Sequence, residues 1–151
     1  MQDPRIAYRE AAARGASQVQ LVIRLYEQII EDLRQATSAI EQNNIEVRTG
    51  QINHAILVVG HLQSRLDFQT GGKPARDLDH FYNALRYNLM EAQMLASKEM
   101  LVQQITDLLT VRDAWLEVER TEHPAATGRV EAAAATAATS DSAPARANWK
   151  G

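Results

Sequence analysis

Apolar residues between positions 17 and 119 recur at alternating steps of three and four, in four blocks that polar breaks separate. These steps place side chains on one face of a helix with 3.6 residues per turn. We predict one amphipathic helix over 17–41 and a second over 45–69, with the Asn43-Asn44 pair between them. A third helix begins at Pro74, after Gly71-Gly72, and a turn near Ser97 separates it from a fourth that ends near residue 119.

Helices of about 20 to 25 residues span roughly 30 to 38 Å each. Matched lengths and short connections favour antiparallel neighbours. The expected fold is therefore all-α, an antiparallel up-down four-helix bundle over residues 17–119. Residues 1–16 form an N-terminal arm. Residues 120–151 are rich in Ala, Thr and Ser with very few large apolar side chains, so we expect a disordered low-complexity tail.

The third predicted helix carries more apolar residues than one core-facing stripe needs. At 100° per residue, Tyr87, Met90 and Met94 fall roughly 140° to 200° from the core position Leu85. They should therefore face outward. Methionine is flexible and is frequent on surfaces that accept varied apolar partners. We predict that these three side chains bind a partner.

Apolar positions beyond the core stripe also occur on the other three helices. Large exposed apolar patches usually mark a partner site, and an amphipathic helix laid along the bundle would use them. A broad stripe can equally mark a deeply buried helix, and for the first and fourth helices both readings stay open. The additional candidate partner-binding residues are Val19, Ile23 and Ile30 on the first helix, Leu57 on the second, and Val102, Leu109 and Leu116 on the fourth.

Charge and composition exclude several classes of function. The formal net charge of −3, with arginines scattered among carboxylates, argues against a nucleic-acid partner. The absence of cysteine excludes disulfides and thiolate metal sites. No signal-peptide-like start and no run of 18 apolar residues is present, so we expect a cytoplasmic protein without membrane insertion.

Candidate catalytic chemistry is sparse. His54 and His61 lie seven residues apart, on the outer helix face that also carries Leu57. Two histidines need further ligands to hold a metal, so solvated or hydrogen-bonded histidines are expected instead. No phosphate-binding loop and no nucleophile motif accompanies them. We expect no catalytic residue, no metal site, no cofactor and no enzymatic activity.

Arg112 falls in the middle of the apolar arc of the fourth helix. Its stem can pack on the core while the guanidinium reaches solvent. Alternatively, the guanidinium is buried and paired with a carboxylate such as Glu27 or Glu31, because an unpaired buried charge is costly.

The order and spacing of short motifs from Tyr8 to Trp115 resemble the flagellin export chaperone family, FliS. Two positions depart from the family pattern: Gln18 stands where proline is usual, and Glu27-Gln28 replaces Asp-Gly. The matching residues are Ala7-Tyr8, Ala16-Ser17, Leu21, Leu25-Tyr26-Glu27, Ala39-Ile40-Glu41, Ile56-Leu57, Leu66-Asp67, Gly71-Gly72, Asp77-Leu78, Phe81-Tyr82, Glu91-Ala92 and Arg112-Asp113-Ala114-Trp115.

The resemblance implies a cytoplasmic chaperone that binds the C-terminal segment of flagellin, prevents its premature polymerisation, and docks at the flagellar type III export gate. It also implies a partner-binding role for Tyr8 in the arm. Three alternatives stay open: self-association into a weak homodimer or structural bundle, an adaptor with a different helical partner, and a metal enzyme that uses His54 and His61.

Overall fold

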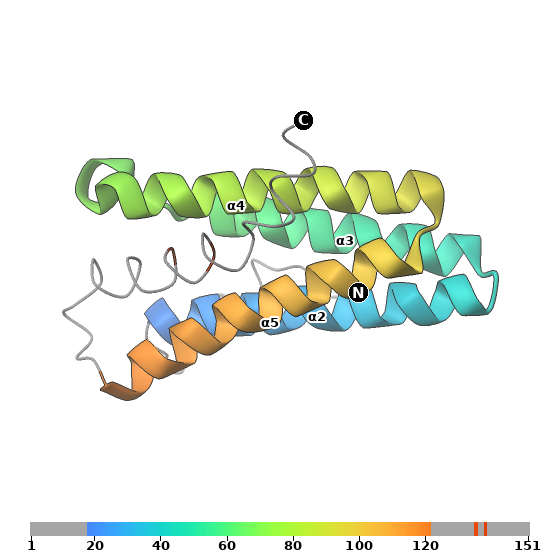
Figure 1. Cartoon of the computed structure of the whole chain (residues 1–151), viewed down its shortest axis with the longest axis horizontal. Helices are drawn as coiled ribbons and strands as arrows, with labels where there is room; N and C mark the ends of the chain where they lie inside the picture. Colours follow the sequence, from blue (N-terminus) through green and yellow to red (C-terminus); the bar gives the residue numbers. More distant parts are fainter. Residues whose placement is uncertain (1–17, 122–134, 136–137, 139–151) are drawn as a thin grey trace.

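Four helices form the bundle of the computed structural model (Figure 1). The structure describes residues 18–121 together with positions 135 and 138. Each helix runs antiparallel to the one before it, so the predicted up-down bundle is confirmed. The predicted arm, 1–16, lies outside the described residues, as does the tail apart from its first two positions and the two alanines. The helices are α2 (Gln18–Glu41), α3 (Ile45–Ser64), α4 (Phe68–Leu95) and α5 (Lys98–Thr121).

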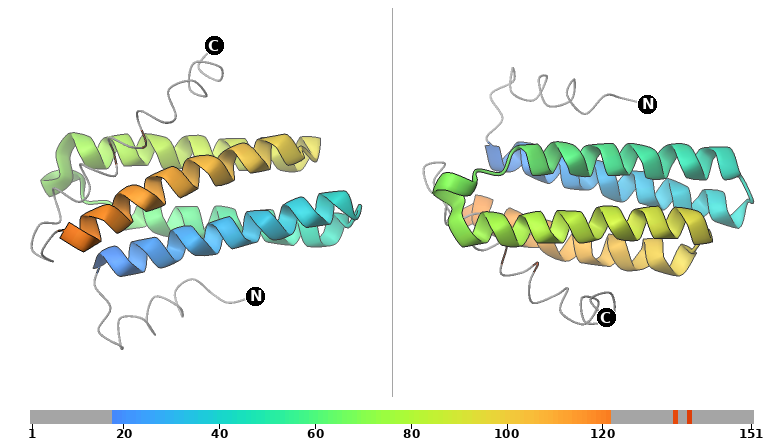
Figure 2. Two further views of the ribbon diagram at one scale, coloured as in Figure 1. Left: turned by 60° about the horizontal axis from the view of Figure 1, so that its bottom comes forward. Right: turned by 90° about the horizontal axis from the view of Figure 1, so that it is seen from above.

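The helices are not packed as a regular square. The N-terminal half of α5 lies near the C-terminal half of α4, to which a short turn joins it (Figures 1 and 2). Along its length α5 diverges from α4 and approaches the beginning of α2. Helix α2 is therefore covered by α3 on one side and by α5 on another, which requires a wide apolar arc on α2.

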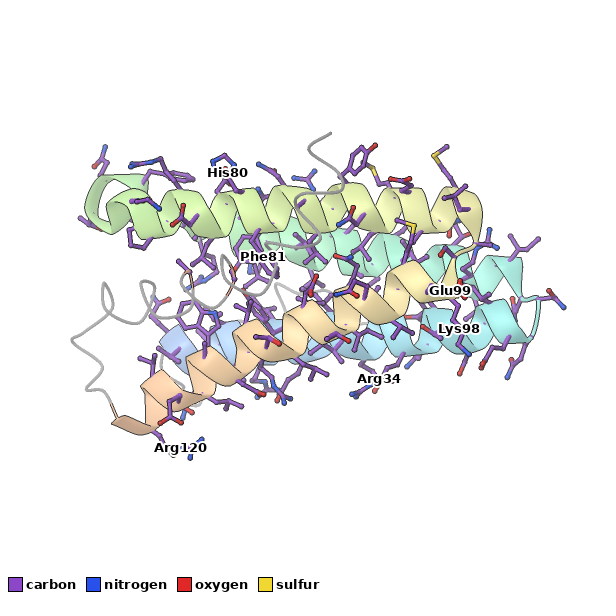
Figure 3. All side chains as sticks on the ribbon, in the orientation of Figure 1. Arg34, His80, Phe81, Lys98, Glu99 and Arg120 are labelled. Atoms are coloured by element: carbon purple, nitrogen blue, oxygen red, sulfur yellow. The ribbon has the colours of Figure 1, made fainter. Side chains whose placement is uncertain are left out.

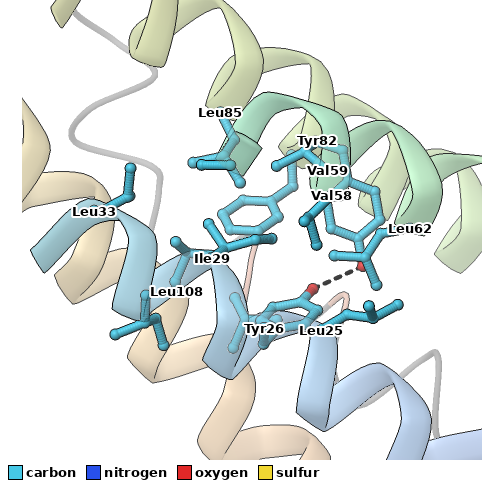
Figure 4. Close-up of a cluster of buried hydrophobic side chains, with 14 of the residues drawn as sticks. Leu25, Tyr26, Ile29, Leu33, Val58, Val59, Leu62, Tyr82, Leu85 and Leu108 are labelled. Atoms are coloured by element: carbon cyan, nitrogen blue, oxygen red, sulfur yellow. Dashed lines mark hydrogen bonds between the residues drawn. The ribbon is translucent and has the colours of Figure 1, made fainter. Parts of the chain in front are cut away.

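All four helices contribute fully buried side chains to one hydrophobic core. At its centre the hydroxyls of Tyr26 on α2 and Tyr82 on α4 lie 2.7 Å apart and form a hydrogen bond (Figure 4). Their rings meet edge to face, with centroids 6.2 Å apart. Since each hydroxyl satisfies the other, two tyrosines are buried in the core without the cost of an unpaired polar group. The largest other fully buried side chains are Ile29, Leu33, Ile52, Val58, Val59, Leu78, Leu85, Leu89, Leu101 and Leu108.

Local side-chain contacts fix two of the predicted helix breaks. At the first, the side chain of Asn44 accepts a hydrogen bond of 3.1 Å from the backbone of Val47 and caps α3. Asn43 before it has a left-handed backbone, with φ 55°. At the second, Ala96 ends α4 with φ 48°, and the hydroxyl of Ser97 accepts from the backbone of Met100. Both breaks lie where the sequence predicts them.

The boundary between the second and third helices differs from the prediction. Helix α3 ends at Ser64, not at residue 69, because Asp67 starts a new helix. Its carboxylate accepts from the backbone of Gln69 at 3.0 Å and from both the backbone and the hydroxyl of Thr70. These bonds, those from Thr70 above all, hold the pKa of Asp67 below its usual range. Helical geometry then breaks at Gly72, with φ 55° and ψ −134°, so Gly72 forms a kink within α4.

None of the helices in the described part of the chain is both long enough and apolar enough to span a bilayer.

Candidate partner-binding surface

An apolar stripe runs along the outer side of α4 near its C-terminal end. Tyr87, Met90 and Met94 are 56%, 51% and 83% exposed, as their angular position predicts. Their spacing of three and four residues aligns them on one helix face, and Leu95 extends the exposed apolar surface. Sulfur-bearing side chains project outward from this part of α4 in Figure 3. We call Tyr87, Met90, Met94 and Leu95 the methionine stripe.

Two further candidates are exposed on other helices. Leu57 projects from the middle of α3 and is 60% exposed, and Val102 is exposed on α5 one turn after that helix begins. Val102 lies near the turn at Ala96, which joins α5 to the end of α4 that carries the methionine stripe. The exposed apolar candidates of α4 and α5 are therefore near the same end of the bundle.

The candidates on α2 are placed differently. For Ile23 and Ile30 a partner-facing and a deeply buried position both stayed open, and the structure buries both side chains in the hydrophobic core. The reason is that α2 lies between α3 and α5. These two helices together cover a wider arc of its surface than one neighbouring helix would. Val19, Leu109 and Leu116 are half-buried and pack against the same core. Tyr8 lies outside the described residues, so its role stays a prediction.

His54 does not lie on the outer face of α3, contrary to expectation. It is buried, and its Nδ1 lies 2.5 Å from Oδ2 of Asp32 on α2. The side chain of Gln28 donates to the other carboxylate oxygen at 2.9 Å. Burial raises the pKa of Asp32 despite these two hydrogen bonds, which act in the opposite direction.

Sequence reasoning missed Asp32 altogether. The available sign was its position, because an aspartate directly before Leu33 and three residues after Ile29 falls inside the apolar arc of its helix. His61 is half-buried. Among the described residues, no three His, Asp or Glu side chains gather where they could hold a metal ion.

Arg112 combines features of both predicted arrangements. Its side chain is 26% exposed, so the guanidinium reaches the surface. There Nη1 lies 3.4 Å from a carboxylate oxygen of Glu27, which joins α5 to α2, and Nη2 donates to Asp113 at 3.1 Å. Glu31, the other predicted partner, accepts a hydrogen bond from Gln35.

The described residues therefore leave apolar side chains exposed on α3, α4 and α5 and bring no metal-ligand cluster together. This arrangement is that of a helical bundle that binds other proteins. Comparison with known proteins agrees: the model of the family described as "Flagellar protein FliS" matches residues 1–122. The chain belongs to the FliS family of flagellar secretion chaperones, and the predicted resemblance is confirmed.

Two relatives show how far the similarity extends. The flagellar secretion chaperone FliSB of Pseudomonas aeruginosa is 31% identical over 106 residues, which cover 70% of this chain and 84% of the relative. The flagellar secretion chaperone FliS of Vibrio cholerae is 28% identical over 109 residues, covering 72% and 80%. Members of this family are cytoplasmic binding proteins that hold flagellin for export and are not enzymes. The predicted class of protein, a flagellin-binding secretion chaperone of the cytoplasm, is thereby confirmed.

Proposed function

We propose that the chain binds the C-terminal segment of flagellin as a helix laid against the bundle, with the methionine stripe of α4 as the main contact. The observation that carries this proposal is the exposure of Tyr87, Met90, Met94 and Leu95 on one helix, each at least half accessible to solvent. Contiguous exposed apolar side chains mark interaction sites, and methionines adapt their shape to the partner.

The rest of the contact surface surrounds this stripe. Val102 extends it onto α5, and Leu57 offers a separate apolar contact on α3. Val19, Leu109 and Leu116 are partly accessible and would contribute at the margins. Tyr8 would add a contact from the arm. A partner helix needs apolar residues at i, i+3, i+4 and i+7 to follow such a surface.

Binding of this kind would keep flagellin competent for export. The C-terminal segment is helical in the filament and unfolded before export, so a bundle that covers its apolar face would prevent polymerisation in the cytoplasm.

We further propose that the loaded complex docks at the flagellar export gate. A pull-down with the cytoplasmic part of the gate, with and without flagellin, tests this step. We expect the chain to be captured only in the presence of flagellin. Failure to capture the chain in either sample would exclude docking at the gate.

A charge placed on the methionine stripe tests the main contact. Met90→Glu with Met94→Glu should weaken binding of the flagellin C-terminal segment at least about tenfold, because two desolvated apolar contacts become buried charges. Thermal unfolding should be unchanged, since both side chains are exposed. Calorimetric titration measures the affinity.

The matched control is Ile45→Glu with Val47→Glu. It makes the same apolar-to-acidic change at two exposed positions at the start of α3. Binding by this control should equal that of the unaltered chain. If both double variants bind equally well, or if the methionine variant unfolds, the proposed contact is wrong.

Self-association is the competing use of the same apolar stripe. A second copy of the chain could cover Tyr87, Met90 and Met94 in a weak symmetric homodimer. Sedimentation over a range of concentrations distinguishes the two. A dimer that dissociates when flagellin is added supports a shared surface, whereas a tight dimer that persists favours a structural role.

A further inference from the structure

Two alanines of the C-terminal tail are part of the bundle core. Ala135 and Ala138 are helical, 2% and 0% exposed, and belong to the same cluster of buried apolar side chains as residues of all four bundle helices. Their spacing of three places them on one helix face. Low-complexity composition had led us to expect disorder here, and at these two positions the structure shows helix instead. The family match ends at residue 122, before either alanine.

The position of this contact follows from the divergence of α5 from α4. In the C-terminal half of α5, Trp115 and Val118 are almost completely buried, although α4 lies farther from this half of α5 than from the other. Phe81 of α4 is also buried and lies between the two helices in Figure 3. Figures 1 and 2 draw the two described tail positions beside α5 on this side. Phe81, Trp115 and Val118 belong to the same buried apolar cluster as the two alanines, and we call the surface that these three side chains form the tail-contact surface.

We propose that the tail-contact surface is a helix-binding site that the chain's own alanine segment occupies in the absence of a partner. The complete burial of Ala135 and Ala138 leaves no room for larger side chains at these two points. A partner helix that replaces the segment must therefore carry small residues three positions apart on its docking face.

The occupant is suited to displacement. Each buried alanine contributes only one methyl group to the contact, so the direct attraction is small compared with that of leucine or phenylalanine. The covalent connection to α5 supplies a high effective concentration that keeps the segment in place. A longer apolar helix that also reaches the methionine stripe can replace it. This competition rests on the proposed function, whereas the contact itself does not.

Ala135→Glu with Ala138→Glu tests the contact in the full-length chain. Both glutamates would enter the apolar cluster, so the segment should dissociate and expose Trp115. The matched control is Ala133→Glu with Ala137→Glu, because these positions fall on the opposite side of a helix that buries 135 and 138. Trp149→Phe in every protein leaves Trp115 as the single tryptophan. The fluorescence maximum should move to longer wavelength in the test variant and stay in place in the control.

A peptide of residues 122–151, also carrying Trp149→Phe, provides a readout independent of flagellin. Added to the test variant at millimolar concentration, which matches the effective concentration that the covalent connection supplies, it should restore the original emission of Trp115. The same peptide with both glutamates should not. If the test variant shows the emission of the unaltered chain, the segment does not cover Trp115. If its emission shifts but the peptide has no effect, the surface is not a helix-binding site. Either result overturns the proposal.

Titration with the flagellin C-terminal segment then tests the competition. Removing the internal occupant should raise the affinity of the test variant at least about threefold over the control. An equal or lower affinity would overturn the competition. A further outcome is that neither the test variant nor the control binds flagellin, while the peptide still restores the emission of Trp115. In that case the function proposed above is wrong, and the helix-binding site serves a different partner.

Discussion

The contact between Asp32 and His54 places an ionisable pair inside the interface between α2 and α3. Both side chains are almost fully inaccessible to solvent, at 3% and 5% exposed. Removing one member of such a pair leaves a buried polar group without its partner, whereas replacing both with apolar groups removes the desolvation cost as well. We therefore expect the pair to specify how the two helices align more than it stabilises them.

His54→Leu should lower the free energy of unfolding by about 3 to 5 kcal/mol, because Asp32 stays buried without the imidazole. Adding Asp32→Leu should restore most of the loss. Urea unfolding of the unaltered chain, the single variant and the double variant measures both steps. A double variant as unstable as the single one would show that the pair stabilises the fold directly.

The buried phenol of Tyr26 should make the stability of the fold depend on pH in alkaline solution. Burial raises the pKa of its phenol, although the hydrogen bond with Tyr82 acts in the opposite direction. Above the ordinary tyrosine value of 10.0, the unfolded chain loses this proton while the folded chain keeps it. Stability should therefore fall by about 1.4 kcal/mol per pH unit above pH 10 from this group alone.

Comparison with Tyr26→Phe isolates the contribution of this phenol, because other titrations are shared by both proteins. Unfolding free energies measured from pH 9 to 11.5 should converge as the pH rises above 10. Parallel curves for the two proteins would contradict the burial of an un-ionised Tyr26.

The periodicity of the sequence predicts where the helices lie along the chain, but it predicts poorly which faces of each helix other helices cover. Steps of three and four identify four helices, because every helix must bury one face. The angle of Ile23, Ile30 or His54 around its helix does not reveal whether another helix covers that angle. The predicted end of the second helix was five residues too late for a related reason. The side chain of Asp67 caps α4 and so sets where that helix begins.

The kink in α4 depends on one glycine. Gly72 has φ 55° and ψ −134°, a combination that side chains other than glycine rarely adopt. An added methyl group would meet no atom within 4 Å, so any effect of alanine comes from the backbone alone. Gly72→Ala should lower the free energy of unfolding by about 1 to 3 kcal/mol.

Gly60→Ala provides the matched control. Gly60 lies inside α3 and also has no atom within 4 Å of the added methyl, but its backbone is helical. Alanine there should be neutral or stabilising by up to about 1 kcal/mol. Thermal unfolding distinguishes the two variants, and equal midpoints would show that the kink carries no backbone strain.

For the whole molecule, the arrangement of helices provides two apolar surfaces at different ends of the bundle. The methionine stripe is open and lies near the turn that joins α4 to α5. The tail-contact surface lies toward the other end, where α5 diverges from α4, and belongs to the same buried cluster as Ala135 and Ala138, which we propose as its occupant. A long helical client could follow both surfaces once the tail is displaced. The open surface could be predicted from the sequence, but the covered one could not, because alanine-rich composition does not reveal docking.

Binding of flagellin's C-terminal segment to the full-length chain tests the central claim most directly. Calorimetric titration should show saturable heat, and far-ultraviolet circular dichroism of the mixture should show more helix than the sum of the separate components. That gain is expected because the segment folds on the apolar faces of the bundle. Absence of heat at high micromolar concentrations, or binding without any gain in helix, would contradict a bundle that holds a partner's helices.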